Sequence, residues 1–169
     1  MFFLESFSKF AKTINYGKRN IFEFPETFKV SCLIKSPKQY DVEELIKVIG
    51  NKILGYNEAN IIVQYNDKIL NRFSTDDCEL QALLDKSIVP HTYNLMIRTR
   101  FQESLETIIC HEMKHFDQYE KDDSGLAFIY KGKEYKSSTD YYSRPWEKEA
   151  RSAQFELWKE FKKLYYKNE

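Results

Sequence analysis

The chain has 169 residues, with 26 Lys and Arg against 26 Asp and Glu, so its formal net charge is zero. This balance provides no overall attraction to nucleic acid, and we expect no nucleic-acid partner. A hydrophobic content of 42% predicts a globular protein. The three cysteines lack zinc-ribbon spacing and are typical of a reducing compartment. No stretch approaches the roughly 20 apolar residues of a membrane span, so we expect a cytoplasmic protein.

The first 14 residues carry apolar side chains at helical spacing: Phe3, Phe7, Phe10 and Ile14. This pattern predicts an amphipathic helix. Such a helix either covers the core of this protein or docks on a partner or a membrane surface.

The next 80 residues mix strand and helix patterns. Alternating apolar residues predict strands over 27–36, 59–65 and 92–99, with 68–73 as a hairpin partner of the second strand. Apolar stripes with capping residues predict helices over 41–55, where Asp41 is the N-cap, and over 74–89, where Ser74 or Thr75 is the cap. Gly55 ends the first of these helices.

The remaining residues predict a helix, a hairpin and a second helix. The first helix covers 105–120, a break at Gly125 precedes a short hairpin within 126–135, and Pro145 begins the last helix. The mixed order of helices and strands predicts an α+β fold in one domain, residues 1–169.

The stretch "LETIICHEMKHFDQYE" contains His111 and His115 four residues apart. On a helix this spacing places both imidazoles on one face, where one tetrahedral zinc ion accepts both. Glu112 lies beside that face, within reach of a water molecule at the metal. This arrangement is the His-Glu-x-x-His device of zinc peptidases, in which the glutamate is the general base.

A catalytic zinc ion commonly has three protein ligands, so a third ligand is expected elsewhere in the chain. His91 follows Pro90 before a strand and is interpreted as a turn residue. Glu147 lies on the apolar side of the last helix, whereas Glu149 lies on its polar side. Glu147 is therefore the predicted third ligand, and a salt bridge from Glu147 to Arg144 or Arg151 is the alternative.

A His-Glu-x-x-His helix followed by Glu-x-x-Ala on a later helix resembles the gluzincin branch of zinc metallopeptidases. The segments "CHEMKHFDQYE" and "YYSRPWEKEA" are similar to small zinc peptidases of phages and mobile elements, over Thr92 to Leu164. The resemblance implies a zincin-like fold: a small mixed sheet, the His-Glu-x-x-His helix, a β-hairpin and a C-terminal ligand helix. Residues 1–90 would be an N-terminal α/β portion, and residues 91–169 the zincin-like metal-binding portion.

The resemblance also implies a zinc-dependent metallopeptidase that hydrolyses peptide bonds in a peptide or protein substrate. His111, His115 and Glu147 would hold Zn²⁺, and Glu112 would be the general base. In several gluzincins an Asp follows the Ala of Glu-x-x-Ala. Arg151 stands at that position here, so support for a histidine ligand must come from elsewhere.

Two further features bear on such a reaction. Candidate donors to the oxyanion precede the ligand helix: Tyr141, Tyr142 and Arg144. The strand in "LAFIYKG" is a candidate for edge pairing with an extended substrate.

The alternative function is a catalytically silent zincin-fold module, either a binding protein or a structural component of a virion. Substitution of Glu112 separates the two, because only an enzyme requires that carboxylate.

Overall fold

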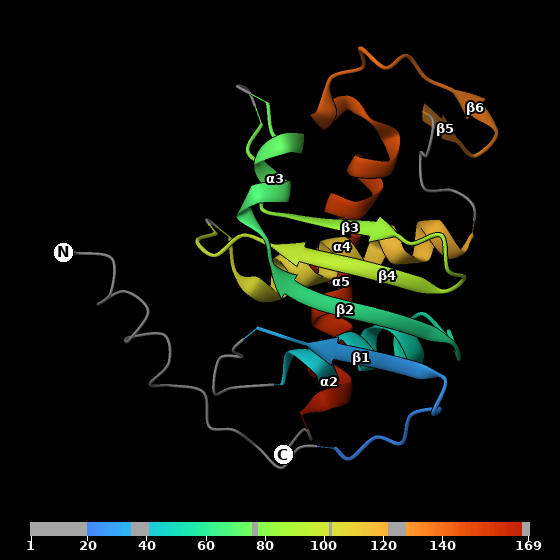
Figure 1. Ribbon diagram of the computed structural model, residues 1–169. Helices are drawn as coiled ribbons and strands as arrows, with labels where there is room; N and C mark the ends of the chain where they lie inside the picture. Colours follow the sequence, from blue (N-terminus) through green and yellow to red (C-terminus); the bar gives the residue numbers. More distant parts are fainter. Residues whose placement is uncertain (1–19, 35–40, 76–77, 102, 122–127, 167–169) are drawn as a thin grey trace.

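The computed structural model describes residues 20–34, 41–75, 78–101, 103–121 and 128–166. A four-stranded sheet has the order β1-β2-β4-β3 (Figure 1), and its strands are β1 (Phe28–Cys32), β2 (Ala59–Tyr65), β3 (Ala82–Lys86) and β4 (Thr92–Ile97). The strands β1, β2 and β4 are parallel, and β3 runs antiparallel to β4 along one edge. The sheet is therefore mixed, as predicted.

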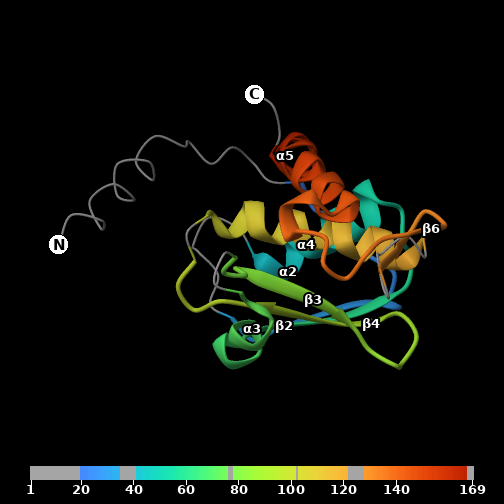
Figure 2. The ribbon, with the colours of Figure 1, turned by 90° about the horizontal axis from the view of Figure 1, so that it is seen from above.

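Helices cover both faces of this sheet (Figure 2). One face carries α2 (Val42–Lys47), which continues into the π-helix η1 (Val48–Ile53), together with α4 (Leu105–Glu120) and α5 (Pro145–Tyr165). The opposite face carries α3 (Asp67–Phe73). Two short elements connect α4 with α5. They are a hairpin of β5 (Ile129–Tyr130) and β6 (Lys133–Glu134), followed by the 3₁₀ turn η3 (Tyr141–Ser143). The α+β prediction is confirmed at this level.

The central strands direct alternate side chains toward the helices. The residues that β2 buries on this side are Ala59, Ile61 and Val63, and those of β4 are Tyr93, Leu95 and Ile97, while Met96 of β4 is buried on the opposite side. This period of two is the signature of a strand that buries one face against a second layer.

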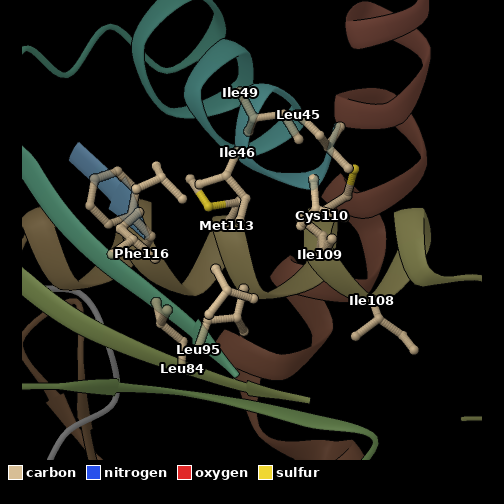
Figure 3. Packing of buried hydrophobic residues seen from close by; sticks show 14 of the residues in the cluster. Leu45, Ile46, Ile49, Leu84, Leu95, Ile108, Ile109, Cys110, Met113 and Phe116 are labelled. Carbon is tan, nitrogen blue, oxygen red and sulfur yellow. The ribbon is translucent and has the colours of Figure 1, made fainter. Parts of the chain in front are cut away.

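Helix α4 packs against the sheet on one side and against η1 and α5 on its other sides (Figure 3). Its side chains Ile109, Met113 and Phe116 are fully buried, with Ile46 on one side and Leu95 on the other. A helix buried on two sides is apolar over most of its circumference. This placement fixes α4 rigidly and leaves its remaining face for polar residues.

Gly50 allows the helical segment α2–η1 to approach β1. A Cβ atom at Gly50 would overlap the ring of Phe28, which is itself 2% exposed. Any larger residue would have to displace this buried ring.

Two predicted elements differ from the structure. Residues 68–73, predicted as a hairpin strand, belong to α3, and the Asn66 side chain caps this helix by accepting the Ile69 N–H at 3.1 Å. Residues 74–89, predicted as a helix, contain β3 instead, in which Ala82 and Leu84 are buried. Both differences arise from contacts between distant parts of the chain.

Other predicted features are confirmed. Asp41 caps α2 through the Glu43 N–H, and Pro145 occupies the first turn of α5. The predicted helix within the first 14 residues and the break at Gly125 lie outside the described residues. Within the described part of the chain, no helix is both long enough and apolar enough to cross a membrane.

Candidate metal centre

Helix α4 places His111 and His115 side by side, as their spacing predicts. Their ring centroids are 4.8 Å apart, and the two Nε2 atoms are 3.1 Å apart. The side chains are 15% and 13% exposed, which puts them at the boundary between the core and solvent. Ser104 fixes the start of this helix by accepting the Thr107 N–H.

The first turn of α5 brings Glu147 to the same point. Its Oε2 atom lies 3.4 Å from His111 Nε2 and 3.5 Å from His115 Nε2. One ligand atom from each of the three residues fits within 4.8 Å of the others. The structure therefore brings together the three residues that the sequence predicted as ligands, from two helices that are separated by a hairpin.

Neither arginine forms the salt bridge that was the alternative for Glu147. Arg144 Nε donates to the Thr139 carbonyl at 3.2 Å, and Arg151 Nη2 donates to the Tyr142 carbonyl at 2.7 Å. Within the described residues, the groups that face the buried Glu147 carboxylate are thus the two imidazoles and the side chain of Tyr141.

Two glutamines orient the imidazoles from behind. His111 Nδ1 is 3.2 Å from Gln154 Oε1, and His115 Nδ1 is 2.8 Å from Gln118 Oε1. An amide oxygen only accepts, so each Nδ1 is the donor and each neutral ring keeps its lone pair on Nε2. No contact of these glutamines with a histidine was predicted, and they supply the support that Arg151 cannot give.

The orientation of Gln118 is itself fixed. Its Nε2 donates to the Trp146 carbonyl at 3.0 Å and to Glu149 Oε2 at 2.9 Å, so only Oε1 remains for the histidine. Glu149 also accepts from the Tyr130 hydroxyl at 2.5 Å and lies 3.4 Å from Lys114 Nζ. Glu149 was predicted to face water, but its carboxylate is 32% exposed and anchors this network.

Three possible ligand atoms therefore converge: Nε2 of His111, Nε2 of His115 and Oε2 of Glu147. Glu147 Oε2 is buried and has no hydrogen-bond partner, because its distances to the two Nε2 atoms exceed those of normal hydrogen bonds. Burial alone lowers the pKa of His115, but Glu147 and Glu112 outweigh it and raise that pKa to about 9. The group thus favours a positive charge at its centre, which a proton on His115 supplies and which a metal cation bound by two imidazoles and one carboxylate would also supply.

Glu112 lies next to this group without being part of it. Its Oε2 accepts the backbone N–H of Leu84 in β3 at 2.8 Å, and its side chain is buried. Burial raises the pKa of Glu112, while His115 and His111 act in the opposite direction. The bond to Leu84 aims the carboxylate past the histidines, which fits proton transfer beside the centre rather than ligation.

Two clefts meet at Glu112 and Tyr141. The first, the His111 cleft, also contains Leu80, Ile108, Arg151 and Gln154. The second, the His115 cleft, encloses about 210 Å³ and also contains Phe73, Leu84, Arg144, Trp146 and Glu147. The wall common to both is β3 and the residues before it. The hairpin strand predicted to pair with a substrate lines neither cleft.

The other candidates lie elsewhere. His91 is in a turn with φ of 52°, and its Nδ1 is 3.0 Å from Glu120, as expected for a residue outside the site. Cys110 is fully buried in the core and does not belong to the group of possible ligands.

The fold and the site define an α+β protein with a candidate metal centre of two histidines and one glutamate. Comparisons of this chain with protein-family models, with curated proteins and with solved structures found no match. The function is therefore inferred from the geometry of the site.

Proposed function

We propose that the protein is a zinc-dependent peptidase of the zincin type, resembling the gluzincins. One observation carries this proposal: His111, His115 and Glu147 present three acceptor atoms to one point, and a carboxylate that is not a ligand, Glu112, stands beside them. Two imidazoles and a carboxylate are a donor set of catalytic zinc sites, which keep a further position for water or substrate.

Zn²⁺ bound at this point would lower the pKa of water and polarise the substrate carbonyl. Glu112 would take the proton of the attacking water and pass it to the leaving amine. The backbone N–H of Leu84 holds one carboxylate oxygen of Glu112, which leaves the other oxygen for this transfer. Tyr141 faces both clefts, and its hydroxyl is our candidate donor to the developing oxyanion.

The substrate would lie along β3, which is an edge strand of the sheet. Arg98 N–H donates to the Gln81 carbonyl across the β3–β4 pair, so the amide groups of Ala82, the next residue, turn away from β4. Ala82 lines both clefts. An extended peptide paired here would cross the Glu112 side of the centre, which favours a peptide over a compact substrate.

The test is Glu112→Gln, which keeps the size of the side chain and removes its basicity. The unchanged protein and the variant are loaded with zinc and incubated with a mixed peptide library, and fragments are identified by mass spectrometry. We expect the variant to retain zinc and to cleave about 10²–10⁴-fold more slowly, the contribution typical of a general base. Equal cleavage by both forms would remove Glu112 from the mechanism.

A non-catalytic module is the second candidate function. It predicts full zinc occupancy in both forms and no fragments from either. Glu103→Gln, a substitution in the wall of the His111 cleft on the segment before α4, is a control for nonspecific effects of charge loss.

A further inference from the structure

Arg144 is held in the wall of the His115 cleft by contacts that leave much of its hydrogen-bonding capacity unused. Its guanidinium lies over three aromatic rings, at 5.4 Å from the centroid of Tyr141, 5.6 Å from Phe128 and 6.0 Å from Trp146. Its Nε donates to the Thr139 carbonyl. A guanidinium has five N–H donors, and among the described residues no hydrogen bond is made by its two terminal nitrogens.

Arg98 shows how a structural arginine of this chain differs. Its guanidinium donates to Leu80 O, Asn71 Oδ1 and Ser74 Oγ, and it lies 3.5 Å from a carboxylate oxygen of Glu79. Across the described residues, no carboxylate lies within 4.0 Å of Arg144. A cation fixed by aromatic stacking and left without an anion is suited to binding one from outside.

The charges of the His115 cleft point to the same conclusion. Apart from Arg144, its charged or titratable residues are two of the candidate ligands, Glu147 and His115, and the neighbouring Glu112. A bound divalent cation would neutralise the two carboxylates. The His115 cleft would then carry a net charge of one, from the guanidinium of Arg144. The rest of this cleft is largely apolar, with Phe73, Leu84 and Trp146 in its wall.

Resting on the peptidase function proposed above, we propose that Arg144 binds a carboxylate of the substrate. The protein then acts on peptides that present a carboxylate beside an apolar residue at the scissile bond. The carboxylate comes from an Asp or Glu side chain or from the C-terminus of the peptide. The guanidinium fork matches either source, because both offer two oxygens to parallel N–H groups.

The experiment separates these two sources. Acetylated heptapeptides with a central Phe carry Glu or Gln at each other position in turn, and each is made as a free acid and as an amide. Binding is measured by calorimetry to zinc-loaded protein that carries Glu112→Gln, so that the peptides are not consumed. Cleavage by the protein with Glu112 intact is measured in parallel on the same set.

We expect peptides with a suitably placed carboxylate to bind at least about tenfold more tightly than their neutral counterparts, as for a hydrogen bond between charged groups. Adding Arg144→Gln should abolish this preference, and Arg144→Lys should retain only part of it because the fork is lost. Arg151→Gln, on the same helix but in the His111 cleft, should leave the preference intact. A preference for Glu identifies a side chain, and a preference for the free acid identifies the chain end.

Two outcomes overturn this inference: equal binding of charged and neutral peptides, or a preference that survives Arg144→Gln. Cleavage without a carboxylate preference would leave the peptidase standing and remove the role of Arg144. A carboxylate preference in binding without any cleavage would support the role of Arg144 and overturn the hydrolysis.

Discussion

Glu147 and Glu149 lie two residues apart at the start of α5, yet they occupy different environments. The Glu147 carboxylate is 8% exposed and faces the two imidazoles. The Glu149 carboxylate faces the hairpin and Gln118, and reaches His115 only through that amide. One residue is therefore a candidate ligand, and the other is a positioning residue that acts through Gln118.

This difference predicts two different losses of zinc affinity. We expect Glu147→Gln to weaken Zn²⁺ binding by more than about 100-fold, because it removes one of three protein ligands. Glu149→Gln should cost about tenfold or somewhat more, as for other partners that act through a ligand. Competition with a zinc chelator measures both affinities. The assignment is wrong if Glu149→Gln loses the metal while Glu147→Gln keeps it.

The residues at the centre of the site were predictable, and their supports were not. The i, i+4 spacing located His111 and His115, and the helix phase separated Glu147 from Glu149. The contact between Glu112 and the Leu84 N–H depends on the position of β3, which no local pattern reveals. Asp117 of α4 is 1% exposed because it accepts from Tyr56, Lys114 and Lys121, contacts that the spacing of residues in the sequence does not reveal.

Gln154 is an intermediate case. It lies seven residues after Glu147, two turns further along the same face of α5, so the helix phase placed it near the centre. Its amide contact with His111 was not predictable from the sequence, because that contact depends on how α4 packs against α5.

At the scale of elements, α3 is a short helix whose sequence pattern wrongly predicted a strand. Residues 68–73 contain Ile69, Leu70 and Phe73, a spacing that fits either a strand or one turn of helix. The Asn66-Asp67 pair suggested a hairpin turn, but Asn66 caps the helix and Asp67 accepts from Thr99 at the end of β4. The deciding contact is thus 32 residues away in the sequence.

The cap of α3 makes a testable prediction. Asn66→Ala removes the acceptor for the Ile69 N–H, and we expect it to lower the free energy of unfolding by about 1 kcal/mol. Asn66→Asp retains an acceptor and should be nearly neutral. Urea denaturation compares the three proteins. Equal losses in both variants would show that Asn66 contributes through something other than capping.

The strand β3 was predicted as a helix because Leu80, Leu83 and Leu84 share one face at helical spacing. In the structure Leu84 is buried toward α4, whereas Leu83 lies half-buried on the opposite face of the strand. Pairing with β4 determines this geometry, and that pairing is a tertiary interaction. The error matters for function, since β3 anchors Glu112 and forms the wall common to both clefts.

At the scale of the whole molecule, the site draws on both portions expected from the sequence. The candidate ligands come from residues 91–169, whereas the N–H that anchors Glu112 comes from residues 1–90. One hydrophobic cluster likewise joins the sheet, α2, α4 and α5 (Figure 3). A metal ion held between α4 and α5 would therefore stabilise a structure that includes the sheet beneath them.

This arrangement predicts that zinc and overall stability are linked. A ligand that binds only the folded state at 1,000 times its dissociation constant adds about 4 kcal/mol to the free energy of unfolding. For a chain of this length, that corresponds to a rise of about 10 °C in the melting temperature. We expect a chelator to lower the melting temperature of the zinc-loaded protein by roughly this amount, as followed by circular dichroism.

His111→Ala is the matched control for this measurement. The variant lacks one candidate ligand, so the chelator should change its melting temperature little. In the unchanged protein, added zinc should restore the original value, because the effect is reversible mass action. The contrary result is that the chelator leaves the melting temperature of the unchanged protein as it was. That result would mean that His111, His115 and Glu147 do not hold a tightly bound metal, and it would contradict the proposed peptidase function.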